Sequence, residues 1–431
     1  MGGENESVIP SQADRTESMI FSLRLGPERA GCMKLTKRTQ RTSWGGRTAR
    51  AGRAFVAAAL SAVLLAGCAG SGAKPVPEEL RADGEFVLKG VSGLTQVAQL
   101  TGRDSINRTH EYEVYGTDLG SMFNVGDVTY MVFGDTFGYR SPGMTGGGGS
   151  DWRSNTLAVI TDDDPSDGLT FDTMMTDYGN HAKELLPSLK VDGEEMTKIP
   201  THGIAVGNTL YLYFMSVNHW GPPGVWYANY GGLAKSTDGG KFWTLLEDVK
   251  WPGDSNFIQV SPYPVKINDS LTEIYLWCIP AGRFGGVKLM KVDEKSIEDF
   301  NAYRYFAGLD KDGEPIWSSD MNDAELVASN NVGVGELSVI WNPYLERWIM
   351  TYLKEGTGVV IREGIRPWGP WGEEIVLVPK EEYPGLYAPF MNPRYLENGG
   401  RTVYFTLSLW DPYNVFWMKV DLEKAEEGTE P

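Results

Sequence analysis

The sequence predicts an all-β fold, a five-bladed β-propeller, from three observations. Between residues 85 and 422 hardly any segment has the 3.6-residue periodicity of an amphipathic helix. Short runs rich in β-branched and aromatic residues alternate there with Gly, Asn, Asp and Pro turns, as expected of consecutive strands. A strand–turn–strand unit recurs five times, which leaves room for blades of about 40–45 residues with long loops between them. A β-sandwich is the main alternative.

The predicted strands are the apolar runs with the clearest boundaries. Paired runs are separated by tight turns such as Gly126-Asp127 and Gly207-Asn208, and Gly at the first position suits a two-residue hairpin turn. The clearest runs are Val128–Phe133, Thr156–Ile160, Thr209–Met215, Glu273–Ile279, Leu337–Ile340, Trp348–Leu353, Val359–Ile361 and Thr402–Leu407.

One turn carries a recognisable motif. Residues 236–243 match the pattern Ser-x-Asp-x-Gly-x-x-Trp through Ser236, Asp238, Gly240 and Trp243. This pattern resembles the Asp-box, a turn between strands in sialidase-like and other glycosidase propellers. In that motif the Ser and Asp side chains bind turn amides and the Trp packs beneath the loop. The motif therefore favours a propeller and predicts a structural role.

The N-terminal region has the features of a secretory signal. Residues 34–53 contain seven Lys and Arg and no acidic residue, and the apolar run 54–65 then leads to Ala66-Gly67-Cys68. A basic segment, a short apolar run and small residues at the break are typical of a signal peptide. The run is shorter than the about 20 residues of a membrane span.

Residues 65–68, Leu-Ala-Gly-Cys, resemble a bacterial lipobox, in which the cysteine becomes the lipidated first residue of the mature protein. The alternative is an ordinary signal peptide with a chance cysteine. We expect a leader over 1–67, a lipidated N-terminus and tether over 68–84, the propeller over 85–422 and a polar tail over 423–431. The protein would then lie on the extracellular face of a bacterial membrane, held by lipid on Cys68.

Charge and cysteine content narrow the classes of partner. The net charge is −18 for the whole chain and +5 for residues 1–67, so the remainder carries −23. Such an acidic domain is a poor match for nucleic acid, whose binding depends on cationic contacts to phosphate.

Only Cys278 lies in the mature domain, which excludes an internal disulfide and a Cys-based zinc site there. Its apolar run predicts a buried, inert thiol.

The motifs of several enzyme classes are absent from the sequence. There is no Gly-rich phosphate loop, no His-Glu-x-x-His and no nucleophile elbow. The spacing of His110, His181, His202 and His219 suggests no metal cluster, and we predict neither a metal nor a cofactor. The acidic run 162–168 lacks the terminal Glu of a calcium loop, so a solvated turn is the better interpretation.

The first predicted hairpin contains a pair of carboxylates. If Gly126-Asp127 is its turn, Val125 pairs with Val128, and Asp118 then faces Asp135 across the ladder. Direct cross-strand neighbours have Cβ atoms about 4.5–5.5 Å apart, and retaining glycosidases hold their carboxyl groups about 5–5.5 Å apart. One of two such carboxyls should have a raised pKa, as a general acid requires. The alternative is that both aspartates only cap turns.

Three segments carry a resemblance that favours the catalytic interpretation. These are residues 116–120 (GTDLG), 133–137 (FGDTF) and 152–155 (WRSN). They resemble a family once known only as a domain of unknown function, whose characterised members are endo-D-arabinanases of glycoside hydrolase family 183. The resemblance covers about residues 90–420. It implies a five-bladed propeller, cleavage of α-linked D-arabinofuranose chains in cell-wall arabinogalactan and lipoarabinomannan, and a catalytic pair carried over as Asp118 and Asp135.

Other residues are weaker candidates for substrate binding. Asn155 enters a strand, and His202 precedes the second hairpin much as Asp118 precedes the first. Arg283 and Glu336 occupy comparable positions in later blades. Trp220 and Tyr387 lie on Gly- and Pro-rich loops and are candidate sugar platforms. These side chains also have structural interpretations, as turn residues, solvated charges or loop anchors. Two functions compete with a hydrolase: a glycan-binding lipoprotein without catalysis, and a scaffold for envelope proteins.

Overall fold

The computed structural model describes residues 76–81 and 84–425. The chain divides into two units, 1–71 and 72–431, and every described residue belongs to the second. The predicted leader, the apolar run and Cys68 lie outside the described residues. Within the described part, no helix has the length and apolar character needed to cross a membrane.

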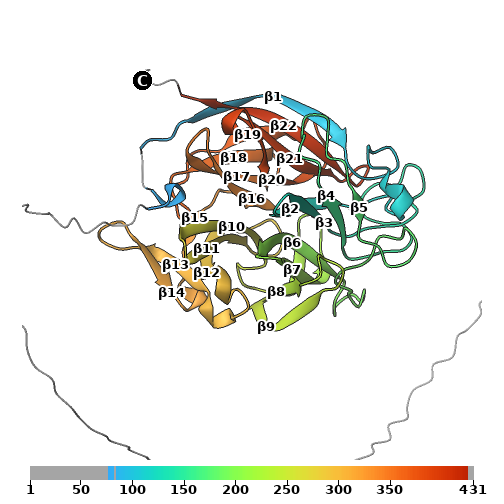
Figure 1. Ribbon diagram of the computed structural model, residues 1–431, viewed down its shortest axis with the longest axis horizontal. Coiled ribbons are helices and arrows are strands. Elements are labelled where there is room, and N and C mark those ends of the chain that lie inside the picture. The colour runs from blue at the N-terminus through green and yellow to red at the C-terminus, as the bar shows by residue number, and fades with distance from the viewer. Residues whose placement is uncertain (1–75, 82–83, 426–431) are drawn as a thin grey trace, which may run out of the picture. The chain divides into compact units, whose positions relative to one another are not determined.

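The described chain forms five antiparallel sheets, which are the blades of a β-propeller (Figure 1). Blade 1 consists of β2 (Leu119–Val125), β3 (Val128–Phe133), β4 (Thr156–Ile160) and β5 (Thr173–Met174). Blade 2 consists of β6 (Thr197–Val206), β7 (Thr209–Trp220), β8 (Trp226–Ser236) and β9 (Thr244–Pro252).

Blade 3 is the largest sheet, because two short strands extend it. It contains β10 (Gln259–Asn268), β11 (Leu271–Ile279), β12 (Val287–Asp293), β13 (Arg304–Leu309), β14 (Pro315–Ser318) and β15 (Leu326–Ala328). Blade 4 contains β16 (Leu337–Asn342), β17 (Arg347–Lys354), β18 (Gly358–Gly364) and β19 (Ile375–Pro379).

The first and the last strand of the described chain lie together in blade 5. This sheet contains β20 (Leu386–Glu397), β21 (Thr402–Leu409) and β22 (Asn414–Lys424), and its outer strand is β1 (Leu88–Gln99). β1 pairs antiparallel with β22, so that Gln99 lies opposite Phe416. The first strand therefore completes the last blade and closes the ring (Figure 1).

The first strands of the blades form the inner ring. β2 contacts β6, β6 contacts β10, β10 contacts β16, β16 contacts β20, and β20 contacts β2. Because each blade is an antiparallel meander, the start of its first strand and the end of its second strand lie at the same edge of the ring. Large aromatic side chains fill the spaces around this ring, and Trp251, Trp277, Trp348 and Trp417 are fully buried.

The turn between β8 and β9 has the hydrogen bonds predicted from its motif. Asp238 Oδ1 accepts the backbone N–H of Lys241 at 3.1 Å and of Phe242 at 3.0 Å. Ser236 Oγ accepts the N–H of Gly240 at 3.0 Å, and Trp243 Nε1 donates to Gly240 O at 2.9 Å. The motif is therefore structural, as predicted, because its side chains satisfy the backbone of the turn.

Most of the predicted strands agree with the structure, including Val128–Phe133 and Thr156–Ile160 at their predicted bounds. The five predicted hairpins are the first and second strands of the five blades. Two boundaries differ. Glu78–Leu80, within the predicted tether, is a 3-10 turn, and Trp348 Nε1 donates to Glu79 O at 2.8 Å. The last strand continues through Lys424, beyond the predicted start of the tail.

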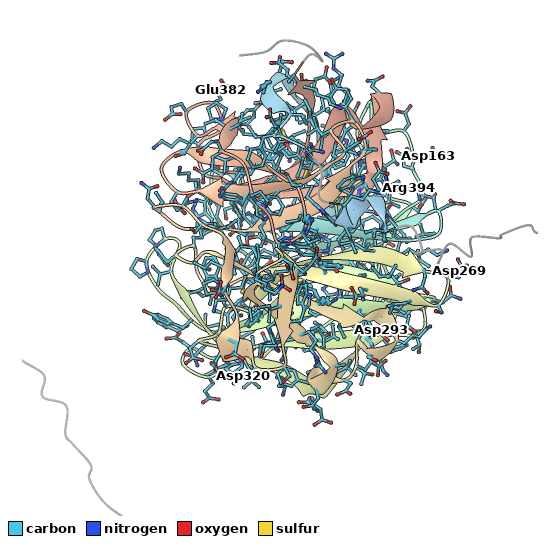
Figure 2. The ribbon with its side chains drawn as sticks, turned by 90° about the vertical axis from the view of Figure 1, so that its left-hand side faces the viewer. Asp163, Asp269, Asp293, Asp320, Glu382 and Arg394 are labelled. Atoms are coloured by element: carbon cyan, nitrogen blue, oxygen red, sulfur yellow. The ribbon has the colours of Figure 1, made fainter. Side chains whose placement is uncertain are left out.

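The acidic character of the sequence appears at the outside of the ring. Figure 2 shows Asp163, Asp269, Asp293, Asp320 and Glu382 projecting from the ribbon, with Arg394 among the labelled exterior side chains. The acidic run 162–168 forms an exposed turn in which Asp162 and Asp164 accept backbone N–H groups, in agreement with the turn interpretation.

Candidate active site

The aspartate pair lies at the edge of the ring where the first strands begin. Asp118 directly precedes β2, and Asp135 follows β3 by two residues. The hairpin turn and the first pairs have the predicted register, with Val125 opposite Val128 and Ser121 opposite Val132. The register then shifts by one residue, so that Leu119 lies opposite Phe133.

The predicted direct pairing of Asp118 with Asp135 is therefore wrong. Leu119 and Gly120 adopt φ values of 68° and 81°, which breaks the regular ladder at this point. The Gly134 N–H donates to Asp118 O at 3.2 Å, so Asp118 faces Gly134. A Cβ at Gly134 would clash with Asp118 Oδ1, and glycine therefore leaves room for that carboxyl. The two aspartates remain neighbours on a diagonal.

Asp118 is half-buried, and its two oxygens have different surroundings. Oδ2 accepts a hydrogen bond from the Tyr387 hydroxyl at 2.9 Å, whereas Oδ1 is shielded from solvent and has no partner among the described residues. Burial is the main reason that the pKa of Asp118 is raised to about 7, and the charge of Asp135 raises it further. Hydrogen bonds from Tyr387 and Tyr413 act in the opposite direction.

Asp135 is buried and strongly hydrogen-bonded. Its Oδ1 accepts from the Thr197 hydroxyl at 2.6 Å and from Trp152 Nε1 at 2.8 Å. Burial raises the pKa of Asp135 to about 6, while these two donors and the nearby charge of Lys190 hold it lower than burial alone would. The pKa of Asp135 is the lower of the two, and its donors stabilise the charged form, so Asp135 is the better placed of the pair to remain a carboxylate.

A charged cluster lies next to the pair. Arg283 donates from Nη2 to Glu336 Oε1 at 2.8 Å and from Nη1 to Glu355 Oε1 at 2.8 Å. Its guanidinium also stands 5.4 Å from the centre of the Tyr387 ring. The charge of Glu336 contributes to the raised pKa of Asp118, which places this carboxylate beside the pair. Glu336 Oε2 is buried and has no partner among the described residues.

Asn155 has a structural role in this arrangement. Its Nδ2 donates to Leu186 O at 3.0 Å and to Lys198 O at 2.8 Å, and its Oδ1 accepts the N–H groups of Leu185 and Leu186. These bonds use both donors and both acceptor positions of the amide. The prediction that this amide binds a sugar hydroxyl is therefore not supported; it anchors a loop.

His202 lies deeper than predicted. It stands five residues before its hairpin turn, whereas Asp118 stands eight residues before its own, so the two are not at the same level. His202 lines a central cavity of about 240 Å³ together with distal parts of the inner strands, such as residues 122–124 and 391–393. Burial lowers the pKa of His202 to about 4, so its ring is neutral near pH 7.

The two predicted sugar platforms differ from each other. Tyr387 is buried at the start of β20, and its hydroxyl binds Asp118, so it is part of the aspartate site rather than an exposed platform. Trp220 is 36% exposed at the end of β7 and packs edge-on against Trp226, with ring centroids 6.0 Å apart.

Sequence reasoning did not single out Tyr413, Thr197 or Trp152 as contacts of the pair. Trp152 stood in a quoted motif, and Tyr413 lies on a loop between the second and third strands of its blade. Every such loop reaches the edge where the first strands begin. The position of Tyr413 in such a loop therefore predicts that it lies at the same edge as the aspartates.

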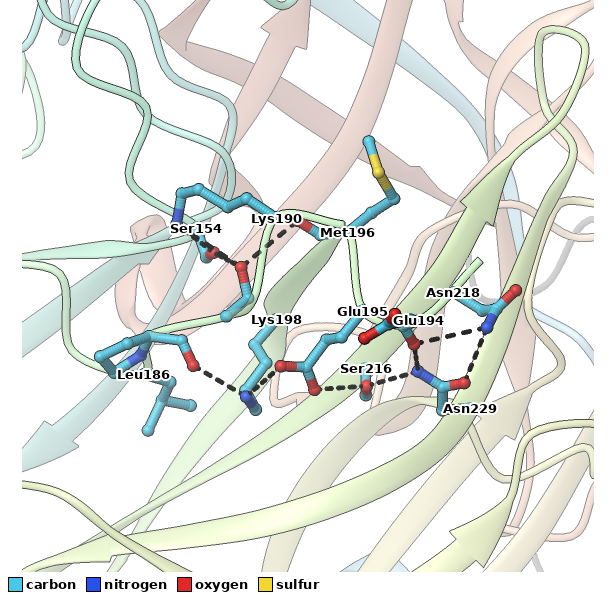
Figure 3. A network of polar contacts seen from close by, with 12 residues as sticks. Ser154, Leu186, Lys190, Glu194, Glu195, Met196, Lys198, Ser216, Asn218 and Asn229 are labelled. Atoms are coloured by element: carbon cyan, nitrogen blue, oxygen red, sulfur yellow. Dashed lines mark hydrogen bonds and ion pairs between the residues drawn. The ribbon is translucent and has the colours of Figure 1, made fainter. Parts of the chain in front are cut away.

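A network of polar side chains fixes the segment that carries Thr197 (Figure 3). Lys198 Nζ donates to Glu195 Oε1 at 2.5 Å, Ser216 Oγ donates to Glu195 Oε2 at 2.8 Å, and Asn229 Nδ2 donates to Ser216 Oγ at 3.1 Å. Lys190, from the same connection, donates to Glu184 Oε1 at 2.5 Å. These bonds fix the backbone around Thr197, one of the two donors of Asp135.

The structure also gathers Glu113, Asp151 and His181, which the sequence spacing did not suggest. Their ligand-type atoms lie within 4.8 Å of one another. The Arg153 guanidinium stands 3.3 Å from Asp151, and His181 contacts Asp151 at 2.9 Å and Asp177 at 2.7 Å. A resident guanidinium opposes a further cation, so this cluster is better described as an ion-pair network between loops.

Fold and site together define a five-bladed β-propeller protein with an interacting pair of aspartates at one edge of its central ring. Residues 104–419 match the family described as "Domain of unknown function (DUF4185)". The chain belongs to this family.

Curated relatives and solved structures give further likenesses. The chain is 28% identical over 243 residues to notoamide biosynthesis cluster protein J of Aspergillus sp. (strain MF297-2), which covers 54% of this chain and 62% of that protein. It is 28% identical over 320 residues to notoamide biosynthesis cluster protein J′ of Aspergillus versicolor, covering 69% and 81%. The match to the first relative thus spans less than two thirds of that protein's length.

Among solved structures, the fold is similar to that of a protein from Bacteroides ovatus ATCC 8483, with 13% identity, a TM-score of 0.48 and coverage of 78% of this chain and 93% of that one. The native arabinanase of Bacillus subtilis has 12% identity, a TM-score of 0.38 and coverage of 71% and 96%. The functional assignment rests on the residues of the site.

Proposed function

We propose that the protein is a glycoside hydrolase that cleaves α-D-arabinofuranosyl chains of cell-wall arabinan at internal positions. The observation that carries this proposal is the Asp118–Asp135 pair. The two carboxyls are close enough for the charge of Asp135 to raise the pKa of Asp118. They also have different hydrogen-bond partners, as an acid and a nucleophile require.

In the proposed mechanism Asp135 is the nucleophile. Its donors Thr197 and Trp152 keep it charged, and it attacks the anomeric carbon while the bond to the leaving oxygen breaks. Asp118, whose pKa is the higher of the two, begins protonated and gives its proton to that oxygen. Asp118 then takes a proton from water, which attacks the anomeric carbon and releases Asp135. Retention of configuration is part of this proposal, and it requires the two carboxyl groups to stand about 5–5.5 Å apart.

Glu336 and Arg283 are proposed to bind the sugar. Glu336 Oε2 is buried and has no partner in the part of the chain that the structure describes, and an unsatisfied buried acceptor is costly unless a ligand supplies a donor. Sugar hydroxyls are such donors. Arg283 holds the other oxygen of Glu336 by two N–H groups, which fixes the direction of the free oxygen.

We further propose that lipid on Cys68 holds the protein on the extracellular face of a bacterial membrane, next to wall polysaccharide. The signal-peptide pattern of the sequence supports this location. Cys68→Ser should release the protein into the soluble fraction, because the acyl chains supply the attachment. Membrane fractionation equal to that of wild type would contradict the anchor.

The direct test of activity is incubation of the protein with arabinogalactan, followed by chromatography of the released oligosaccharides. Asp118→Asn and Asp135→Asn should each lower cleavage by about a hundredfold or more, because an amide neither attacks nor protonates as required. Asp127→Asn, at the far end of the same hairpin, is the matched control and should retain activity. Full activity of both site variants, with unchanged circular dichroism, would exclude this pair and favour a glycan-binding propeller.

A further inference from the structure

Trp410 is an exposed tryptophan on a fixed backbone. Trp410 is 54% exposed and directly follows β21. Its N–H donates to Gly385 O at 2.9 Å, and its carbonyl accepts from the Gly146 N–H at 2.8 Å. A Cβ on Gly146 would clash with the indole, so glycine allows that loop to lie directly against the ring.

Trp410 is connected to the aspartate pair through one residue. Its ring packs edge-on against that of Tyr413, with centroids 5.8 Å apart. Tyr413 is buried, and its hydroxyl is near enough to Asp118 to lower the pKa of that carboxyl. The exposed indole therefore lies one side chain away from the proposed acid.

Trp220 is connected to the same aspartate from the other direction. It packs against Trp226, and the Arg283 guanidinium lies 5.8 Å from the centre of the Trp226 ring. The same guanidinium lies 5.4 Å from the centre of the Tyr387 ring, and Tyr387 binds Asp118. A continuous series of contacts thus joins the second exposed tryptophan to the pair.

The two tryptophans flank the blade that carries the aspartates. Asp118 and Asp135 belong to blade 1, while Trp220 belongs to blade 2 and Trp410 to blade 5, the two neighbours of blade 1 in the closed ring. Both indoles lie where a second strand ends, which is the edge at which β2 begins. The pair therefore lies between two exposed indoles at one edge of the ring.

We propose that Trp220 and Trp410 are stacking platforms for separate sugar units of one glycan chain that crosses the aspartate pair. Tryptophan offers a large, rigid apolar face with little conformational entropy to lose, which suits the C–H face of a neutral furanose. A neutral ligand also suits an acidic domain. This inference rests on the proposed function and adds the course of the substrate: the chain extends past the pair on both sides, so cleavage is internal.

The test compares Trp410→Ala and Trp220→Ala with wild type on arabinan oligosaccharides of increasing length. Each variant should lose about tenfold in kcat/KM on the longest substrates, the effect of removing one aromatic anchor from an interface. The loss should shrink as the substrate becomes too short to reach the missing ring. Phe242→Ala is the matched control, because Phe242 is 71% exposed but lies on the turn at the opposite edge.

The affinity of the Asp118→Asn variant for arabinogalactan can be measured without cleavage, so it tests the platforms separately from the proposed hydrolase activity. Addition of either tryptophan substitution to this variant should weaken its retention in native gels that contain arabinogalactan. If wild type cleaves arabinan and both tryptophan variants match it at every length, the platforms are wrong and the hydrolase stands. If wild type cleaves nothing, the hydrolase fails, and unaltered retention of the double variants would overturn the platforms as well. An equal loss at all lengths would also overturn them, because it indicates a general structural effect.

Discussion

The hydroxyl of Tyr387 offers a sharp test of the roles given to the two aspartates. Tyr387→Phe keeps the ring beneath Arg283 and removes only the donor that binds Asp118 Oδ2 at 2.9 Å. That donor stabilises the carboxylate form, so its loss should raise the pKa of Asp118 above its present value of about 7.

The size of the shift follows from the strength of the bond. A hydrogen bond to a charged acceptor contributes about 1.5–3 kcal/mol, and about 1.36 kcal/mol corresponds to one pKa unit. Removal of the donor should therefore raise the pKa by about 1–2 units on these figures. Tyr413 also lowers the pKa of Asp118 and should continue to do so in the variant, so we expect the lower end of this range.

The assay is the pH dependence of kcat/KM on an arabinan oligosaccharide. A general acid is active while protonated, so the high-pH limb of the profile reports Asp118 and should move to higher pH by about one unit. Tyr404→Phe is the matched control, because the Tyr404 hydroxyl donates to Glu397 at 2.8 Å near the opposite edge. An unmoved high-pH limb would refute the role of Tyr387. Movement of the low-pH limb instead would make Asp118 the nucleophile.

Three further predictions concern stability and reactivity. The pKa of Asp118 is about 7 in the fold against 3.8 ordinarily, so its contribution to stability is complete below pH 4 and is lost as pH rises towards 7. The free energy of unfolding of Asp118→Asn, taken relative to wild type, should therefore be higher at pH 8 than at pH 4 by up to about 4 kcal/mol. An equal difference at both pH values would contradict this. Asn155→Ala should lower the free energy of unfolding by about 3 kcal/mol or more, because it leaves several buried backbone groups unpaired; urea unfolding at wild-type stability would show that the amide is dispensable. Cys278 is fully buried and burial raises its pKa, so a thiol reagent should label it only after denaturation, and rapid labelling of the native protein would contradict the structure.

The fold could be predicted from the sequence because each hairpin is specified locally. Turn residues such as Gly126-Asp127 and alternating apolar runs fix both the strands and their pairing. The site could be predicted only in part. Asp118 and Asp135 belong to one hairpin, so the register of that hairpin predicts that they are neighbours. The register shift that sets them on a diagonal requires Leu119 at a φ of 68°. A leucine rarely adopts that conformation, and no local pattern indicates it.

The remaining errors concern relations between distant segments. The prediction for His202 uses only the fact that this residue precedes a hairpin. Its depth in the ring is determined by the number of residues between it and the turn. Asn155 binds residues 185–186 and 198, which no spacing in the sequence connects to it. Tyr387 and Tyr413 meet Asp118 only because the ring brings blade 5 next to blade 1.

The pairing of β1 with β22 has a consequence for how the protein is made. Residues 88–99 leave the ribosome among the first of the domain, but their partner strand, residues 414–424, is synthesised last. The ring therefore cannot close on a nascent chain, and pairing across so long a separation slows folding. Under the export proposed above, this delay would keep the chain unfolded while it crosses the membrane. A chain shortened before residue 414 should leave its first strand unpaired, with an exposed edge that is prone to aggregate.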